Sequence, residues 1–338
     1  MVSTRKVARK LYACLAAGVL LAAVVFVGSG CSAQQTYFNT YELVANVPNW
    51  EKSKSLQGMA SGTDCIYVAK VDRADLEPTS SAPSKTVLYR IPANEDGEAE
   101  QLTCSSTGEG YSEDLYHAND MTCFNLNGEE YLVVASMACG EDALKVLKVG
   151  QDDKVETAGS YAVQMEEAGS DPLANRATGV AFMEETQSGG AKLLVSNAGK
   201  LYVTRLDPET ANGTLTCTYV GTLDRASAVI DGKQEDLSNW VDQGIAYSNG
   251  CVYAPYCDGE NRSVVLEYEG VGDENAAANG VLYPNKNVSF RITSKKYSDL
   301  FEIEGVDICD GKLFFAANCR AEGLQDCDLV GCFKGFRG

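Results

Sequence analysis

The sequence is poor in the residues on which several common chemistries depend. His117 is the only histidine among 338 residues, and the 13 cysteines include no two CxxC pairs, so a structural zinc site has weak support. No G-x-S-x-G motif occurs, which argues against a nucleophilic serine triad of the hydrolase type. Helical periodicity is also lacking after the first thirty residues, so the sequence predicts a chain built from strands.

Basic residues are scarce as well. The chain has 28 Lys and Arg against 47 Asp and Glu, and its formal net charge is −19. Because such a surface repels phosphate groups, the composition argues against nucleic acid as a partner. Solubility is the simplest reason for an acidic surface of this size.

The first thirty residues differ from the rest of the chain. Four basic residues at positions 5, 6, 9 and 10 precede an apolar run from Leu11 to Val27 that ends in small residues. This order predicts an export signal over residues 1–30, and the run is short for a permanent membrane span. The segment carries no acidic residue, so its removal would change the net charge from −19 to −23.

Gly28-Ser29-Gly30-Cys31 resembles the bacterial lipobox, in which small residues precede a cysteine that receives a diacylglycerol. The sequence departs from that family at Gly28, where Leu is usual. The resemblance implies a lipid on Cys31, a short tether over residues 31–35 and a place on the outer face of the cell membrane, with the lipid chains supplying the affinity. An ordinary cleaved signal would give a secreted protein instead, and an uncleaved one would itself be the anchor.

Eleven cysteines remain besides Cys14 in the signal and Cys31, and an odd number cannot all pair within one chain. Cys319, Cys327 and Cys332 cluster near the C-terminus and are the strongest disulfide candidates. In reducing surroundings all of them would remain thiols.

A short pattern recurs five times along the chain. A polar residue is followed by Gly or Asp, then by Met, Val or Ile, and then by Ala, Thr or Asp. The successive steps between the second residues are 62, 59, 65 and 61. The five copies are Gln57-Gly58-Met59-Ala60, Asn119-Asp120-Met121-Thr122, Thr178-Gly179-Val180-Ala181, Gln243-Gly244-Ile245-Ala246 and Glu304-Gly305-Val306-Asp307.

Each copy precedes a turn and an apolar run, and two of the turns contain the hairpin dipeptides Asn249-Gly250 and Asp310-Gly311. Units of short strands repeated around an axis are typical of a β-propeller, whereas a two-sheet sandwich would not need such a repeat. We therefore predict an all-β, five-bladed β-propeller over residues 36–338. The last repeat lacks an outer strand, and Thr36 to Val47 would supply it by pairing with Asp328 to Phe336, so that the N-terminal strand closes the last blade.

Equivalent positions in the five repeats would gather at one mouth of the central channel. The polar ring would consist of Gln57, Asn119, Thr178, Gln243 and Glu304. Four positions before each Gly or Asp stand Lys54, Tyr116, Asn175, Trp240 and Phe301. A polar centre with aromatic edges suits a small ligand, a glycan or a peptide. The alternative is that these side chains only fill the joints between blades.

Titratable residues stand near the same positions. His117 titrates near neutrality and lies close to Asp120, which makes it a candidate acid or base or a ligand contact, although a lone histidine in a loop is more often structural. Asp120, Asp242, Glu304 and Asp307 could hold a hard cation, and calcium is the candidate cofactor.

The segments "LQGMASGTDCIYVAKV" and "DQGIAYSNGCVYAPY" resemble strand openings of the plant-type glutaminyl cyclases, a five-bladed family. The resemblance covers the repeat framework and implies cyclotransferase chemistry. That family carries its acidic residue in the second repeat, where this chain has Asn119, whereas Glu304 lies in the fifth. The arabinanase-like glycosidases need carboxylates on separate blades beginning with the first, where Gln57 stands.

The sequence thus predicts an exported, lipid-anchored protein that binds a small ligand, glycan or protein at the channel mouth. One alternative is a propeller hydrolase, lyase or cyclotransferase that uses Glu304, Asp307, Asp120 or His117 as acid or base. The other is a structural or assembly scaffold.

Overall fold

A computed structural model describes residues 35–72, 85–93, 97–150, 152–166, 175–272, 280–325 and 327–338. The predicted signal peptide, Cys31 and all of the tether except Gln35 lie outside these residues. Within the described ranges, no helix is long and apolar enough to cross a membrane. The described residues form strands, turns and loops, together with a 3-10 turn, η2 (Gly140–Asp142).

The strands pair in chain order into antiparallel sheets. The first sheet contains β3 (Ser53–Ser61), β4 (Cys65–Asp72), β5 (Val87–Pro92) and β6 (Glu100–Gln101). The second contains β8 (Asp120–Leu126), β9 (Glu129–Ala135), β10 (Leu144–Val149) and β11 (Lys154–Met165). The third contains β12 (Gly179–Glu185), β13 (Ala191–Asn197), β14 (Lys200–Leu206) and β15 (Asn212–Leu223).

Two further sheets follow. The fourth begins with two short strands, β18 (Val241–Asp242) and β19 (Ala246–Ser248), which both pair with β20 (Cys251–Cys257), and it continues with β21 (Arg262–Glu269) and β23 (Val288–Thr293). The fifth contains β24 (Leu300–Cys309), β25 (Lys312–Arg320), β26 (Leu329–Phe333) and β2 (Tyr41–Asn46).

Further strand pairings join or extend these sheets. The outer strands β11 and β15 pair in parallel, so the second and third sheets are continuous. β7 (Thr103–Cys104) and β22 (Val281–Leu282) add parallel pairs to β11 and β15, respectively. β16 (Ala228–Ile230) and β17 (Lys233–Glu235) form a separate hairpin.

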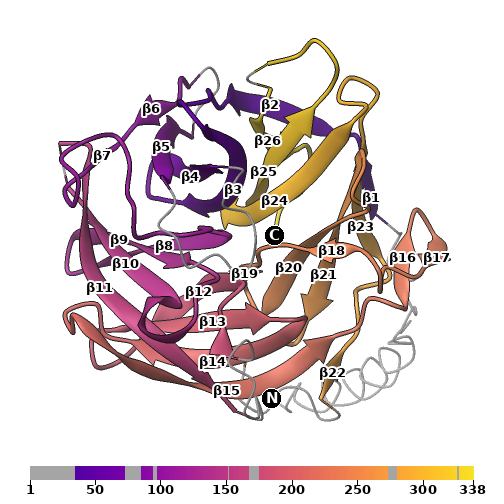
Figure 1. Ribbon diagram of the computed structural model, residues 1–338. Helices are drawn as coiled ribbons and strands as arrows, with labels where there is room; N and C mark the ends of the chain where they lie inside the picture. Colours follow the sequence, from indigo (N-terminus) through magenta and orange to yellow (C-terminus); the bar gives the residue numbers. More distant parts are fainter. Residues whose placement is uncertain are drawn as a thin grey trace, which may run out of the picture. The chain divides into compact units, whose positions relative to one another are not determined.

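The first strands of the sheets surround a common axis. β3 contacts β8, β8 contacts β12, β12 contacts β19, β19 contacts β24, and β24 contacts β3 again. Figure 1 shows these strands around the centre, with the outer strands of each sheet at the periphery. A closed circle of inner strands with sheets radiating from it is a β-propeller, which confirms the fold class predicted from the repeat.

The N-terminal segment closes the ring as predicted, with one difference. β2 pairs with β26 in antiparallel fashion, from Tyr41 opposite Phe333 to Asn46 opposite Leu329. The predicted single strand from Thr36 to Val47 is divided, because β1 (Gln35–Phe38) runs parallel to β23 on the neighbouring fourth sheet. The segment therefore binds the outer edges of two sheets rather than one.

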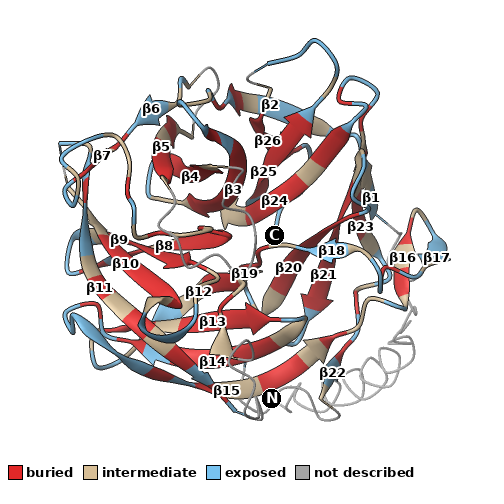
Figure 2. Cartoon of the chain, in the orientation of Figure 1, coloured by how far each residue is buried: buried red, intermediate tan, exposed pale blue. Residues whose placement is uncertain are grey.

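Among the described residues, buried apolar side chains form five clusters, each between neighbouring sheets. On β4, Ile66 and Val68 face the cluster shared with the fifth sheet, and Tyr67 and Ala69 face the cluster shared with the second. Because strand side chains alternate between the two faces, a strand buried on both faces reads as a continuous apolar run. In Figure 2 the middle strands are accordingly buried, and exposure is concentrated in outer strands and loops.

Two local features of the repeat have clear steric causes. A Cβ atom added to Gly58 would lie 2.8 Å from the backbone of Ala118 and Asp120, so the inner strands pack too closely there for a side chain. Asn249 and Gly250 have φ of 49° and 81°. Both angles are left-handed, as the predicted hairpin turn requires.

An ion pair inside the protein joins the first and last sheets. Lys70 Nζ on β4 lies 2.8 Å from Asp328 Oδ2, and the two side chains are 0% and 4% exposed. The ammonium group also donates to the carbonyl of Val47 at 3.1 Å and to Asn49 Oδ1 at 2.7 Å, while Asp328 Oδ1 accepts the N–H of Cys319 at 2.8 Å. We call this group the closing cluster, because it links both ends of the ring.

Candidate functional site

The polar residues of the repeat lie on the inner strands or just before them, and the end of the ring nearest to them is called the mouth. It is the end at which the inner strands begin. Backbone hydrogen bonds between neighbouring repeats align these beginnings: Gly58 donates to Ala118 O at 2.9 Å, and Gly244 donates to Glu304 O at 3.2 Å. These bonds place the first repeat beside the second and the fourth beside the fifth at the level of the predicted ring residues.

Three of the five ring residues bind the backbone. Asn119 Nδ2 donates to Thr178 O at 2.6 Å, Thr178 Oγ1 donates to Ser196 O at 3.0 Å, and Gln57 Nε2 donates to Leu56 O at 2.9 Å. Gln57 and Asn119 are buried. In these positions the side chains satisfy buried backbone groups, which is the joint-filling role.

The other two ring residues, Gln243 and Glu304, both contact the carboxyl group of Glu302. Gln243 Nε2 donates to Glu302 Oε1 at 2.9 Å, and Glu302 is hydrogen-bonded to Glu304. Glu304 is buried, whereas Glu302 and Gln243 are half-buried and reach solvent. The two glutamates are two residues apart on β24, so their side chains project from the same face of the strand. The register of the strand shifts between Ile303 and Gly305.

Burial raises the pKa of Glu304 well above its usual range, and the neighbouring negative charge of Glu302 raises it further. Asn318 Nδ2, 3.4 Å from Glu304 Oε1, opposes these effects only in part. The raised pKa favours the protonated form of Glu304. One carboxyl group that donates beside one that accepts gives the mouth both kinds of hydrogen-bonding atom.

Further polar side chains extend this pair into the first sheet. Asn318 Nδ2 also donates to Ser55 Oγ at 3.1 Å, and Gln57 Nε2 lies 3.5 Å from the same oxygen. Glu302 is the member that the sequence prediction missed. Its signal is the alternation of the strand, because a residue two positions before Glu304 shares its face.

Asp120 does not face the mouth but fills the axis of the ring. Its Oδ2 accepts the N–H groups of Val180 and Ile245, both at 2.9 Å, although Ile245 belongs to the fourth repeat. A Cβ on Gly244 would lie 2.3 Å from Asp120 Oδ1. The carboxyl group therefore crosses the ring at a level where the other repeats have glycine. Burial raises its pKa well above the usual range.

Asp307 lies farther from the mouth than predicted. It follows Glu304 by three residues, roughly 10 Å along a strand, and its Oδ2 accepts the N–H of Ser61 at the end of β3 at 2.6 Å. Burial raises its pKa to about 6. Asp242 is exposed and lies 3.5 Å from Arg225. No group of three or more His, Cys, Asp or Glu side chains suited to a metal ion occurs in the described ranges.

His117 is half-buried between two residues with left-handed backbone angles, Tyr116 at φ 51° and Ala118 at φ 44°. Non-glycine residues seldom adopt this conformation, which costs energy. Burial and the nearby charge of Arg176 lower the pKa of His117 to about 4. His117 is therefore neutral near pH 7 and unsuited to act there as a cationic acid.

The predicted aromatic rim is only partly accessible. Phe301 is fully buried in the cluster between the fourth and fifth sheets, where it packs against Tyr41 and Phe315, so it cannot contact a ligand at the mouth. Tyr116 is half-buried and donates to Asp142 Oδ2 at 2.7 Å. Trp240 is half-buried, with the guanidinium of Arg262 4.8 Å from its ring centre. Lys54 is exposed, and Asn175 Oδ1 accepts the N–H of Met165 at 2.9 Å.

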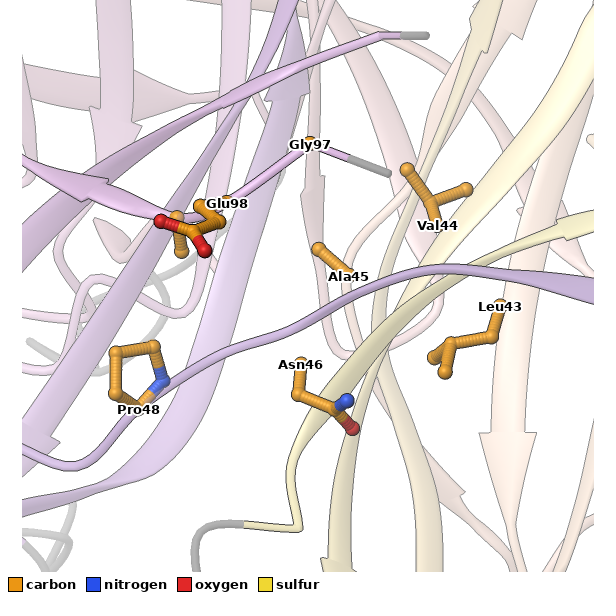
Figure 3. A pocket seen from close by; sticks show the side chains of 8 residues that line it. Leu43, Val44, Ala45, Asn46, Pro48, Gly97 and Glu98 are labelled. Carbon is orange, nitrogen blue, oxygen red and sulfur yellow. The ribbon is translucent and has the colours of Figure 1, made fainter. Parts of the chain in front are cut away.

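Two grooves lie away from the mouth. One of about 580 Å³ runs beside β2, and Figure 3 shows its lining of Leu43, Val44, Ala45, Asn46, Pro48, Gly97, Glu98 and Ala99. Another of about 320 Å³ lies between the first and second sheets and includes Tyr67, Arg90 and Glu130. The ring residues line neither groove, so the carboxyl pair at the mouth is a separate feature.

No family model matches the chain, and a search of curated proteins finds no similar one. Among solved structures, a glycosyl hydrolase from Bacteroides ovatus is 8% identical with a TM-score of 0.47, over 89% of this chain and 92% of that chain. A thermostable family-43 glycoside hydrolase is 12% identical with a TM-score of 0.46, over 82% and 88%. The catalytic domain of a GH62 alpha-L-arabinofuranosidase from Coprinopsis cinerea is 9% identical with a TM-score of 0.38, over 89% and 96%. These likenesses assign no activity to this chain.

Proposed function

We propose that the propeller binds a small polyhydroxylated ligand, such as a glycan, at the mouth. The observation that carries this proposal is the contact between the Glu302 and Glu304 carboxyl groups, held by Gln243 and Asn318. Glu302 and Gln243 are each partly exposed, which gives a ligand access to this group.

The chemistry of this group suits hydroxyl groups. A sugar hydroxyl both donates and accepts, and the site offers a carboxylate as acceptor and an amide as both. Hydrogen bonds to a charged carboxylate are stronger than neutral ones, which favours Glu302 as the main contact. Trp240, three residues before Gln243, supplies a half-buried aromatic surface of the kind that packs against apolar faces of ligands.

Hydrolysis is the second candidate, because a protonated Glu304 beside Glu302 resembles an acid and base pair. Glycosidases, however, place their two carboxyl groups about 5 Å or more apart on either side of the bond that breaks. Two carboxyl groups that are hydrogen-bonded to each other leave no room for a sugar bond between them. Their contact therefore favours binding over hydrolysis.

We also propose that the protein acts at the outer face of the cell membrane. The support is the export signal over residues 1–30 and the lipobox-like sequence that ends at Cys31. The acidic domain would then be held at the surface by lipid chains, and its ligands would come from outside the cell.

The binding proposal is tested by calorimetric titration of the purified protein with a panel of neutral oligosaccharides. We expect at least one to bind, and Glu302→Gln to weaken that binding roughly 10- to 100-fold, because a hydrogen bond to a charged group is lost. Glu129→Gln is the matched control, since Glu129 is an exposed carboxylate at the start of β9, away from Glu302, and it should bind as the unchanged protein does.

Failure of every oligosaccharide to bind, or equal binding by Glu302→Gln, would refute the proposal. Release of reducing sugar from a bound oligosaccharide, lost in Glu304→Gln, would instead support the hydrolase.

A further inference from the structure

The structure separates the three C-terminal cysteines by the face on which they lie. Cys319 is buried in the cluster between the fourth and fifth sheets, and Cys327 packs against that same cluster. Cys332 packs against the cluster on the opposite face, between the fifth and first sheets. Cys319 and Cys327 therefore share a face of the fifth sheet that Cys332 does not.

The register of β25 and β26, extended beyond its last pair, sets Cys319 and Cys327 opposite each other. β25 and β26 pair with Ala317 opposite Leu329. Continuing this register by two residues places Cys319 opposite Cys327. Contact between them is direct, because the Cys327 thiol donates to the Cys319 carbonyl with its sulfur 2.8 Å from the oxygen.

This placement meets the requirements of a disulfide bond. Facing residues of antiparallel strands have Cα atoms about 4.5–5.5 Å apart, and disulfides span about 4.4–6.8 Å. Cys332 faces Phe314 across the same strand pair, so it has no such partner there.

We propose that Cys319 and Cys327 form a reversible disulfide that fastens β25 to the start of β26. The oxidant is a disulfide compound taken up by thiol–disulfide exchange. The Cys327 thiolate, on the half-buried residue, attacks one sulfur of the oxidant and releases one thiolate. The Cys319 thiolate then attacks the Cys327 sulfur and releases the second. Two cysteine thiols lose two electrons and two protons, and the oxidant becomes two thiols.

The surroundings of the two sulfur atoms make the reaction selective and slow. Burial raises the pKa of both thiols, and the carboxylate of Asp328 raises each further. Since the thiolate is the reacting form, oxidation accelerates as the pH rises. An enzyme or a long exposure to oxidant would complete it at neutral pH.

The disulfide would lie beside the closing cluster. Asp328 follows Cys327 directly, and its carboxylate binds both the N–H of Cys319 and Lys70. Joining the two cysteines would fix the segment that holds this carboxylate, and thereby the contact between the first and last sheets. The bond also restricts the conformations that the unfolded chain can adopt, which stabilises the folded protein.

The test uses the full-length protein equilibrated with oxidised glutathione, then denatured, alkylated with iodoacetamide, digested and mapped by mass spectrometry without reduction. We expect Cys319 and Cys327 to be joined in one linked peptide pair lighter by two hydrogens, and Cys332 to be alkylated. Reduction should lower the Tm of the oxidised protein by roughly 3–8 °C.

Cys332→Ser is the matched control and should keep both the linkage and the shift in Tm. Cys327→Ser should abolish both. Alkylation of Cys319 and Cys327 in the oxidised protein, or a linkage of either to Cys332, would overturn the proposal, and neither result depends on any variant folding.

Discussion

At the axis of the ring the second repeat carries Asp120 where the other four carry glycine. The carboxyl group fills space that the glycines leave and accepts N–H groups from the third and fourth repeats. Its Oδ1 has no hydrogen-bond partner among the described residues. A buried carboxylate with one unpaired oxygen is costly, so the protonated form is favoured.

Replacing Asp120 by asparagine should change how stability depends on pH. Because burial raises the folded-state pKa of Asp120, the unfolded chain ionises first, at about pH 4, while the folded protein keeps the proton. The folded protein then loses stability as pH rises from about 4 toward the folded pKa, by about 1.4 kcal/mol per pH unit from this group. Asp120→Asn keeps an acceptor oxygen without this loss.

Urea unfolding between pH 4 and pH 8 measures the effect. The stability of Asp120→Asn relative to the unchanged protein should increase with pH, and parallel curves would contradict the assignment. Asp120→Ala is the comparison that removes the acceptor. It should cost about 2–4 kcal/mol near pH 4, because two buried N–H groups lose their partner, and this cost should shrink as the pH rises, since the variant also lacks the titrating carboxyl group.

At the scale of the strand, the closing cluster couples elements from both ends of the described chain. β4 supplies Lys70, the segment before β26 supplies Asp328, and Val47 after β2 supplies a carbonyl. Both charged side chains are almost completely buried, so each charge is stabilised by the other in place of water.

Lys70→Met should destabilise the protein by about 3–5 kcal/mol, because it leaves the Asp328 carboxylate buried without its counter-ion. The double variant Lys70→Met with Asp328→Asn should recover part of this loss, since no charge then remains buried. Midpoints of guanidinium unfolding provide the measurement. Lys148→Met is the matched control, because its ion pair with Glu129 lies on the surface and its loss should leave the midpoint unchanged. A double variant no more stable than Lys70→Met would argue against this account.

Among the described strands, the β-hairpins were readable from the sequence, and the sharing of β1 was not. Asn249-Gly250 and Asp310-Gly311 need only local backbone angles, and both pairs have the left-handed φ that the dipeptides predict. The division of the N-terminal segment between β26 and β23 depends on where two distant sheets come to lie. A local sequence pattern does not show how close two sheets lie when they are far apart in the sequence.

At the scale of the whole molecule, the propeller and the proposed membrane anchor are separate questions. Five clusters of apolar side chains lie between neighbouring sheets, including the pair formed by the last and the first. The anchor rests on the sequence around Cys31 alone.

Cys31→Ala should release the protein from the membrane if Cys31 carries the lipid. We expect the unchanged protein to sediment with membranes and to enter the detergent phase of a Triton X-114 separation, and the variant to remain in the aqueous phase. Cys139→Ala is the control, because Cys139 is an exposed cysteine of the propeller and its loss should not alter the distribution. Equal membrane binding by Cys31→Ala would show that another segment holds the protein.

The sequence by itself determined the architecture, because a propeller repeats the same local requirements in every sheet. The close approach of inner strands demands small residues such as Gly58, and burial of the middle strands on both faces demands apolar runs. These demands recur at a regular spacing and so can be read without coordinates.

Only the tertiary structure decided which of the repeated positions carries chemistry. Asn119 and Thr178 donate hydrogen bonds to backbone carbonyl groups, and Phe301 is buried in the core. Glu302, which lies outside the repeated pattern, contacts Glu304. Asp120 and Ile245 are 125 residues apart in sequence and meet across the axis. Such contacts are set by how the closed ring brings strand ends together, and equivalent positions in a repeat have the same pattern but different neighbours.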